Sequence, residues 1–138
     1  MKRTVVILSL IFFMLGLCLC LNVHAAKEAK VEVLYMNHGP LMDTVNKMKK
    51  LFSSYGSKLI VSWYDFDTKG GEEFMAKKGI KQHVPLIVWI NGSQNAAIGS
   101  TGKVQFVGFP TGSGPASFQG KWTMDDLKAA LDQATAGK

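Results

Sequence analysis

Two histidines and two methionines are the side chains of this sequence whose types suit metal chemistry. His38 and His83 offer imidazole nitrogens, which bind copper ions in either oxidation state, and Met36 and Met42 offer thioethers, which suit Cu(I). The two histidines do not form a closed ligand set, and the sequence has no His-x-x-x-His or Met-x-x-Met spacing. We therefore predict that the methionines are packing residues and that the chain has no metal site. If copper is bound, His38 and His83 are the candidate ligands.

The first 25 residues have the composition of a secretory signal peptide. Two basic residues precede the apolar run Val5–Leu21, and Val23-His24-Ala25 offers small residues before a cleavage site. We expect cleavage near Ala25, which leaves residues 26–138 as the mature domain in the periplasm or outside the cell. The alternative is an uncleaved membrane anchor, because the apolar run approaches the length of a membrane span.

Both cysteines of the precursor lie inside this predicted signal. Cys18 and Cys20 each follow a leucine, whereas a bacterial lipoprotein signal has a small residue there, so lipid attachment is the less favoured use of these thiols. The mature chain would have no cysteine at all. The absence of cysteine excludes dithiol exchange, a peroxidatic thiolate and a thiolate metal site. We therefore predict that the mature chain is not a thiol enzyme and that it has no cofactor.

The charges of the mature chain argue against nucleic-acid binding. Without Lys2 and Arg3 it has 14 lysines against 10 acidic residues, a net charge of +4, and no arginine. Arginine is the residue that most often binds phosphate, through two hydrogen bonds from its guanidinium group. The lysines of this chain are spread along it without interleaved aromatic residues. We interpret them as a solvated surface.

The histidines must be positioned by strands and helices that the sequence marks clearly. Val31–Met36 alternates as a strand does, and Pro40 suits the first position of a helix. The helix should bury a stripe spaced i, i+4, i+7, i+11 and stop near Tyr55-Gly56. The members of this stripe are Leu41, Val45, Met48 and Phe52.

The rest of the chain continues the alternation of strands and helices. Lys58–Asp67 is a strand whose nearly continuous apolar run suits a central strand covered on both faces. Thr68–Lys78 is a helix with acidic residues in its first turn and lysines in its last, and Pro85–Ile90 is a third strand. A final helix starts at Thr123, which can form a capping box with Asp126.

The segment between the third strand and the final helix is rich in glycine. We expect Asn95–Ile98 to form a hairpin with a strand over Lys103–Phe109. Four aromatic residues here can cover the core or form an exposed contact patch, and we favour core cover. They are Phe106, Phe109, Phe118 and Trp122. The element order predicts one α/β domain with a mixed sheet and helices on both faces.

At the level of motifs, residues 31–134 resemble the thioredoxin-like family. His38-Gly39-Pro40-Leu41 stands where the family has Cys-Gly-Pro-Cys, and the connector Gly79–Pro85 resembles the family's connector to its cis-proline. The resemblance implies a central mixed sheet of four to five strands flanked by three helices, with a Gly-rich insertion at about 93–118. In the family the proline of this connector is cis and faces the turn, and the sequence leaves open whether the Val84–Pro85 peptide is cis.

We therefore expect an exported, redox-inactive thioredoxin-like domain that binds a protein or peptide through the His38–Pro40 turn, the Val84–Pro85 loop and the Gly-rich insertion. The candidate binding residues are His38, Gly39, Pro40, Val84 and Pro85. The positive end of the helix disfavours an imidazolium, so His38 should be neutral at physiological pH. The alternative function is periplasmic copper handling through His38 and His83, and a membrane is involved only if the signal is not cleaved.

Overall fold

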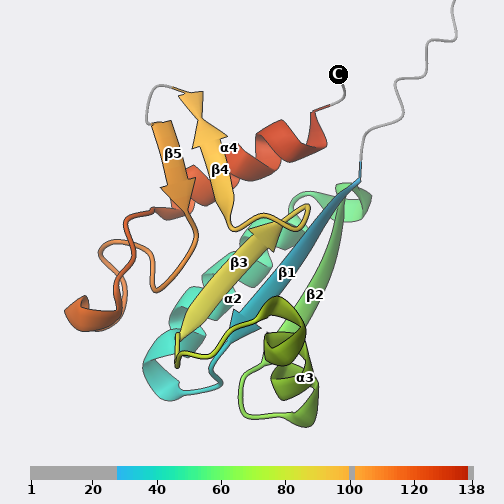
Figure 1. Ribbon diagram of the computed structural model, residues 1–138. Helices are drawn as coiled ribbons and strands as arrows, with labels where there is room; N and C mark the ends of the chain where they lie inside the picture. The colour runs from blue at the N-terminus through green and yellow to red at the C-terminus, as the bar shows by residue number, and fades with distance from the viewer. Residues whose placement is uncertain (1–27, 100–101, 137–138) are drawn as a thin grey trace, which may run out of the picture.

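A computed structural model describes residues 28–99 and 102–136, which form an α/β fold with three helices (Figure 1). The predicted signal peptide, its cleavage site and both cysteines lie outside the described residues. Within those two ranges, no helix is both long and apolar enough to cross a membrane. The prediction of an α/β fold with three helices is confirmed.

The central sheet has three strands, fewer than the four to five that were predicted. β1 (Ala29–Tyr35) lies between β2 (Leu59–Asp65), which is parallel to it, and β3 (Leu86–Ile90), which is antiparallel. Among the described residues, the Gly-rich segment meets β3 only at two isolated bridges, Ile87 with Val107 and Ile90 with Ser93. The sheet is mixed, as expected, but this segment runs beside β3 without the continuous pairing that would make it a fourth strand.

β2 is an edge strand, and the prediction that it is central was wrong. The strand order is β2-β1-β3, so β1 takes the middle position. A nearly continuous apolar run indicates that both faces of a strand contact other residues, but it does not indicate how many strands are paired with it. The side chains of β2 are mostly half-buried, and Ile60 is 46% exposed.

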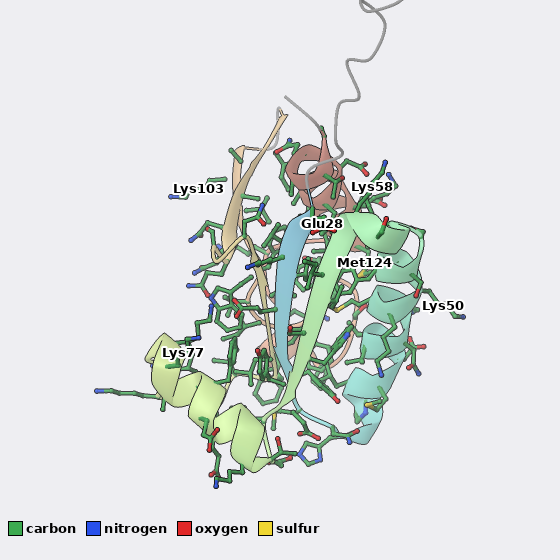
Figure 2. The ribbon with its side chains drawn as sticks, turned by 90° about the vertical axis from the view of Figure 1, so that its right-hand side faces the viewer. Glu28, Lys50, Lys58, Lys77, Lys103 and Met124 are labelled. Atoms are coloured by element: carbon green, nitrogen blue, oxygen red, sulfur yellow. The ribbon has the colours of Figure 1, made fainter. Side chains whose placement is uncertain are left out.

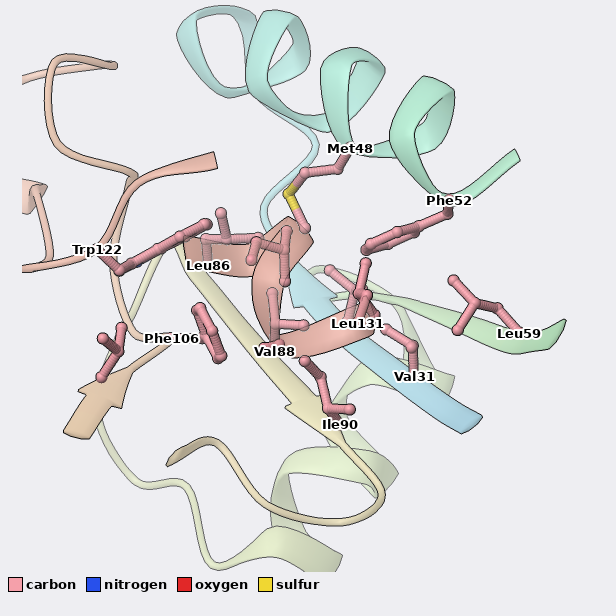
Figure 3. Packing of buried hydrophobic residues seen from close by; sticks show 14 of the residues in the cluster. Val31, Met48, Phe52, Leu59, Leu86, Val88, Ile90, Phe106, Trp122 and Leu131 are labelled. Atoms are coloured by element: carbon pink, nitrogen blue, oxygen red, sulfur yellow. The ribbon is translucent and has the colours of Figure 1, made fainter. Parts of the chain in front are cut away.

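Helices cover both faces of the sheet, as predicted. α2 (Gly39–Ser53) and α4 (Met124–Thr135) pack on one face, where they enclose the larger core (Figure 3). The predicted stripe of α2 is buried in this core, together with Leu127 and Leu131 of α4. α3 (Lys69–Lys78) covers the opposite face, where Phe74 packs with Leu34 and Trp89.

The helix ends largely follow the sequence signals. Pro40 lies in the first turn of α2, and the Thr68 hydroxyl accepts a hydrogen bond from the Gly71 N–H at the start of α3. Thr123 and Asp126 form the predicted capping box of α4. The predicted stop of α2 at Gly56 is too late, because the helix ends at Ser53 and a short 3₁₀ turn follows.

The Gly-rich segment begins with the predicted hairpin. β4 (Asn95–Ile98) pairs antiparallel with β5 (Gly102–Gln105), and the two form a separate small sheet. β5 ends earlier than the predicted strand over Lys103–Phe109, because the chain then turns to run along β3. There the N–H of Val88 donates to the Phe106 carbonyl and the N–H of Gly108 to the Leu86 carbonyl.

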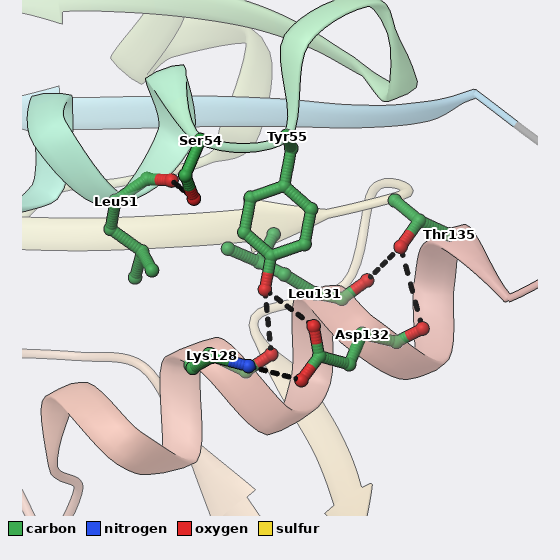
Figure 4. A network of polar contacts seen from close by, with 7 residues as sticks. All are labelled: Leu51, Ser54, Tyr55, Lys128, Leu131, Asp132 and Thr135. Atoms are coloured by element: carbon green, nitrogen blue, oxygen red, sulfur yellow. Dashed lines mark hydrogen bonds and ion pairs between the residues drawn. The ribbon is translucent and has the colours of Figure 1, made fainter.

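A polar network joins the end of α2 to α4 (Figure 4). The Tyr55 hydroxyl donates to the Asp132 carboxylate at 2.7 Å, and Lys128 donates to the same carboxylate at 2.7 Å. The bonds from Lys128 and then from Tyr55 hold the pKa of Asp132 below its usual range. Burial, followed by the bond to Asp132, raises the pKa of Tyr55 well above its usual value.

Tyr55→Phe should therefore change how stability depends on pH. Asp132 has a lower pKa in the folded chain, so its contribution is complete above its unfolded pKa, about 4, and is lost as the pH falls through the folded value. The variant loses one cause of the shift, so its deficit in unfolding free energy should be largest at pH 7 and shrink toward pH 2. Urea unfolding across this range measures it. A deficit that is constant with pH would contradict the role of Tyr55.

Candidate functional site

The ends of the three sheet strands bring two loops and a turn together. β1 and β2 are parallel and in register at Tyr35 and Asp65, so the residues that follow both strands lie at the same end of the sheet. β3 is antiparallel to β1, and the loop that precedes it therefore reaches this end as well. The N–H of Met36 donates to the Pro85 carbonyl at 3.1 Å, which ties that loop to the turn before α2.

The turn before α2 places His38 opposite a carboxylate. His38 Nε2 lies 3.3 Å from Asp67 Oδ2, and both side chains are more than half exposed. The contact is an ion pair only when the imidazole is protonated. The position of Asp67 beside His38 was not predicted, because the two residues are far apart in sequence.

The loop before β3 carries His83 and Pro85 to the same place. The His83 ring contacts Phe66 edge-on, with centroids 4.5 Å apart and planes at 72°. The described residues contain no cis peptide bond, so the Val84–Pro85 peptide is trans. The sequence left this isomer open, and in this respect the connector differs from that of the resembled family.

The Gly-rich segment supplies a third wall. The N–H of Phe109 donates to the Phe118 carbonyl at 2.9 Å, and the N–H of Gly120 donates to the Phe109 carbonyl at 2.7 Å. Gly108 makes this close approach possible, because it has φ +79° and a Cβ there would lie 2.6 Å from the Phe118 carbonyl oxygen. The loop between Phe109 and Phe118 thus closes on itself and stands beside the turn.

These three segments enclose a cavity of about 230 Å³ whose lining is almost wholly apolar. The lining residues are Met36, His38, Pro40, Leu41, His83, Pro85, Phe109, Pro115 and Phe118. His38, Pro40 and Pro85 were predicted as site residues, and all three line the cavity. Gly39 and Val84, the other two, flank lining residues but are not part of the lining.

Other side chains near the turn and in the Gly-rich segment differ in how far they are buried. Met42 is half-buried against the larger core and does not line the cavity. Tyr35 packs edge-on against Trp63 at 5.7 Å, where burial and then the charge of Asp65 raise the pKa of its hydroxyl. Of the four aromatic residues in the Gly-rich segment, Phe106, Phe109 and Trp122 are buried as expected, whereas Phe118 is 50% exposed.

The cavity holds two imidazoles but no complete set of metal ligands. His38, His83 and the thioether of Met36 all line it. Nowhere in residues 28–99 and 102–136 do three His, Cys, Asp or Glu side chains gather closely enough to hold a metal ion. A copper ion here would depend on two nitrogens and a sulfur, one of the nitrogens lying next to Asp67.

Sequence reasoning missed Asp67 as a neighbour of His38. It included the Gly-rich insertion in the binding surface but favoured a core position for Phe118. A signal for Asp67 was present, because two parallel strands that end together bring the residues after them side by side. No local pattern could place Phe118, since its position depends on how the glycine-rich loop folds back.

Comparison of the chain with protein-family models, curated proteins and solved structures finds no match in any of the three. The case for a function therefore rests on the residues and geometry of the chain itself.

Proposed function

We propose that this chain is an exported, redox-inactive, thioredoxin-like binding domain that holds an apolar side chain of a protein or peptide in this cavity. The observation that carries the proposal is the meeting of three distant segments around one apolar hollow: the Met36–Leu41 turn, the His83–Pro85 loop and the Phe109–Phe118 loop. Export is inferred from the N-terminal composition, and redox inactivity from the absence of cysteine after Cys20.

The size and lining of the cavity favour a single side chain over a cofactor. Sites for drug-sized ligands and cofactors measure about 300–1,000 Å³ and include several placed polar groups. This cavity measures about 230 Å³, and its polar groups are the two imidazoles. An apolar side chain entering it would contact Leu41 and Phe109, while the polar backbone on either side of that side chain stays in water.

Phe118 is the cavity residue from which a bound partner would remove the most apolar area from water. It lines the cavity and yet is 50% exposed, one of two large apolar side chains among the described residues that are this open to water. A large apolar side chain left exposed at a hollow marks a contact site better than one that stands alone on a flat surface. Covering the Phe118 ring would remove apolar area from water at about 25 cal/mol per Å².

A panel of blocked pentapeptides, Ala-Ala-X-Ala-Ala, tests the proposal. With X as Phe, Leu or Met, we expect shifts of the NMR signals of Met36, Leu41 and Phe118 on titration, and no shifts with X as Ser or Lys. Phe118→Ala should weaken binding of the Phe peptide about tenfold, because the lost contact is worth about 1.5 kcal/mol.

Ile60→Ala is the matched control, since Ile60 is similarly exposed, at 46%, but lies on β2 and outside the cavity lining. Equal weakening by the two substitutions, or shifts for no apolar peptide, would overturn the proposal.

Copper handling is the second candidate, and the observation in its favour is that His38, His83 and Met36 line one cavity. Calorimetric titration with Cu(II), and with Cu(I) under reducing conditions, separates it from peptide binding. Affinity weaker than millimolar, or affinity unchanged by His38→Ala, would remove copper as a candidate.

A further inference from the structure

The free edge of β2 is the second feature of this molecule that is open to a partner. Figure 2 looks onto this edge, with β2 running down the front of the molecule between α2 and α3. Its seven residues are paired without interruption to β1, and no other strand of residues 28–99 and 102–136 pairs with β2. Edge strands are usually protected by lysine, proline or a bulge, and the sequence Leu-Ile-Val-Ser-Trp-Tyr-Asp contains neither of those residues.

The backbone groups that point outward from β2 can be assigned. The N–H of Phe66 donates to the Tyr35 carbonyl, so the even-numbered residues of β2 direct their N–H and C=O toward β1. Val61 and Trp63 therefore point both of their backbone groups away from the sheet. Among the described residues, these groups have no hydrogen-bond partner.

At each end of this outward row, one of the two backbone groups already has a hydrogen-bond partner within the chain. The N–H of Leu59 donates to the Gly56 carbonyl, and the carbonyl of Asp65 accepts from the N–H and the hydroxyl of Thr68. The free row is therefore the Leu59 carbonyl, both groups of Val61, both groups of Trp63, and the Asp65 N–H. This row begins with an acceptor, the Leu59 carbonyl, and ends with a donor, the Asp65 N–H. An antiparallel copy of the same row would therefore present a donor opposite each acceptor and an acceptor opposite each donor.

We propose that a second copy of this chain pairs its β2 with this edge, antiparallel and about a twofold axis through Ser62. In that register Val61 exchanges both backbone hydrogen bonds with Trp63 of the second copy, and the Asp65 N–H donates to the Leu59 carbonyl of the second copy. Every free group of the row is satisfied. An axis through Val61 leaves the Asp65 N–H unpaired, and one through Trp63 directs the Val61 N–H at the Asp65 carbonyl that Thr68 already uses.

The side chains match in the same register. Val61 lies opposite Trp63 of the second copy on the α2 face, and Ile60 lies opposite Tyr64 on the other face, so both faces gain pairs of β-branched and aromatic residues. Antiparallel pairing also brings Lys58 of one copy toward Asp65 of the other, because these charges stand at opposite ends of β2. On the α2 face, a hollow of about 430 Å³ lies beside Val61 at the edge. On the opposite face, a hollow of about 380 Å³ extends from Ile60 across β1 to the turn after β3.

Disulfide trapping tests the register directly. In the full chain with Cys18 and Cys20 replaced by serine, Ser62→Cys places two thiols opposite each other at the axis, with Cα atoms about 4.5 Å apart. Oxidised glutathione should then link two copies. Ile60→Cys is the matched control, because the axis separates the two copies of residue 60 by about 13 Å along the strands. Linkage of neither variant, or of both at equal rates, would overturn the proposal.

Sedimentation of the otherwise unaltered chain tests the dimer without a thiol. We expect the mass of two copies at micromolar concentration, and at least a tenfold weaker dimer for Ile60→Lys, with Phe118→Ala unchanged. A monomer would overturn the proposal. A monomeric Ser62→Cys chain whose introduced thiol is protected from alkylation would also overturn the proposal. In that case the occupant of the edge would be the residues that precede Glu28 and not a second copy.

Discussion

Trp122→Ala is expected to lower the free energy of unfolding by about 3–5 kcal/mol, the cost of removing a large aromatic side chain from a core. Trp122 is 1% exposed and packs edge-on against Phe106, with ring centroids 5.4 Å apart. Its indole N–H donates to the Gly108 carbonyl at 3.2 Å, and its own carbonyl accepts from the Thr111 N–H at 2.7 Å. The ring therefore supports the segment that forms the third wall of the cavity. Denaturant unfolding followed by circular dichroism measures the loss.

Trp122→Phe is the control that separates the ring from its hydrogen bond. Phenylalanine fills most of the indole volume but leaves the buried Gly108 carbonyl without its donor, so a smaller loss of about 1–3 kcal/mol is expected. Because Phe109 and Phe118 are held by the same segment, the alanine variant should also bind the Phe pentapeptide more weakly than Trp122→Phe does. Equal stability of the alanine and phenylalanine variants would show that the ring is not a packing centre.

Gly71→Ala is expected to destabilise the chain by about 1–3 kcal/mol or more, because the added methyl has no room. A Cβ on Gly71 would lie 1.9 Å from the carbonyl oxygen of Asp65 and 2.7 Å from its carbonyl carbon. Both atoms are backbone and cannot rotate away, so α3 must move from the end of β2. This end carries Asp67, and the 3.3 Å contact between Asp67 and His38 should be lost in the variant.

Gly70→Ala is the control in the same turn of the same helix. The nearest atom to a Cβ on Gly70 is the Thr68 hydroxyl at 3.9 Å, an ordinary contact. Alanine is the better helix former, so this variant should be more stable than the wild type by up to about 1 kcal/mol. The two neighbouring substitutions thus change stability in opposite directions, and thermal unfolding of the pair side by side measures both. The same sign for both would contradict the account of the close approach.

Much of the fold could be predicted because its signals are local. The alternation in Val31–Met36, the apolar stripe of α2 and the Thr123–Asp126 capping box each depend on residues within a few positions of one another. Helices on both faces follow from the order of the elements. The central position of Lys58–Asp67 could not be predicted this way, because strand order depends on which edges pair and not on the composition of one strand.

The lining of the cavity was predicted in part, and the reason for the gap is the same. A strand, a turn and a helix mark the places of His38 and Pro40 in the sequence, whereas Pro85 was singled out through the resemblance of its connector to that of the thioredoxin-like family. Phe118 and Asp67 belong to the site through a folded-back loop and through the common end of two parallel strands. These contacts join residues that are tens of positions apart, where no periodicity connects them.

By itself, the sequence determined the element types, the helix caps, the absence of cysteine after Cys20 and the turn at His38, since each depends on side-chain chemistry or short-range geometry. Only the tertiary structure decided that β2 is an edge, that its free backbone groups complement themselves, and that three distant segments close an apolar cavity beside His38. Short-range preferences specify what each segment becomes. The pairing of strands specifies which segments meet. The cavity lies where distant segments meet, and the free edge of β2 lies where pairing stops.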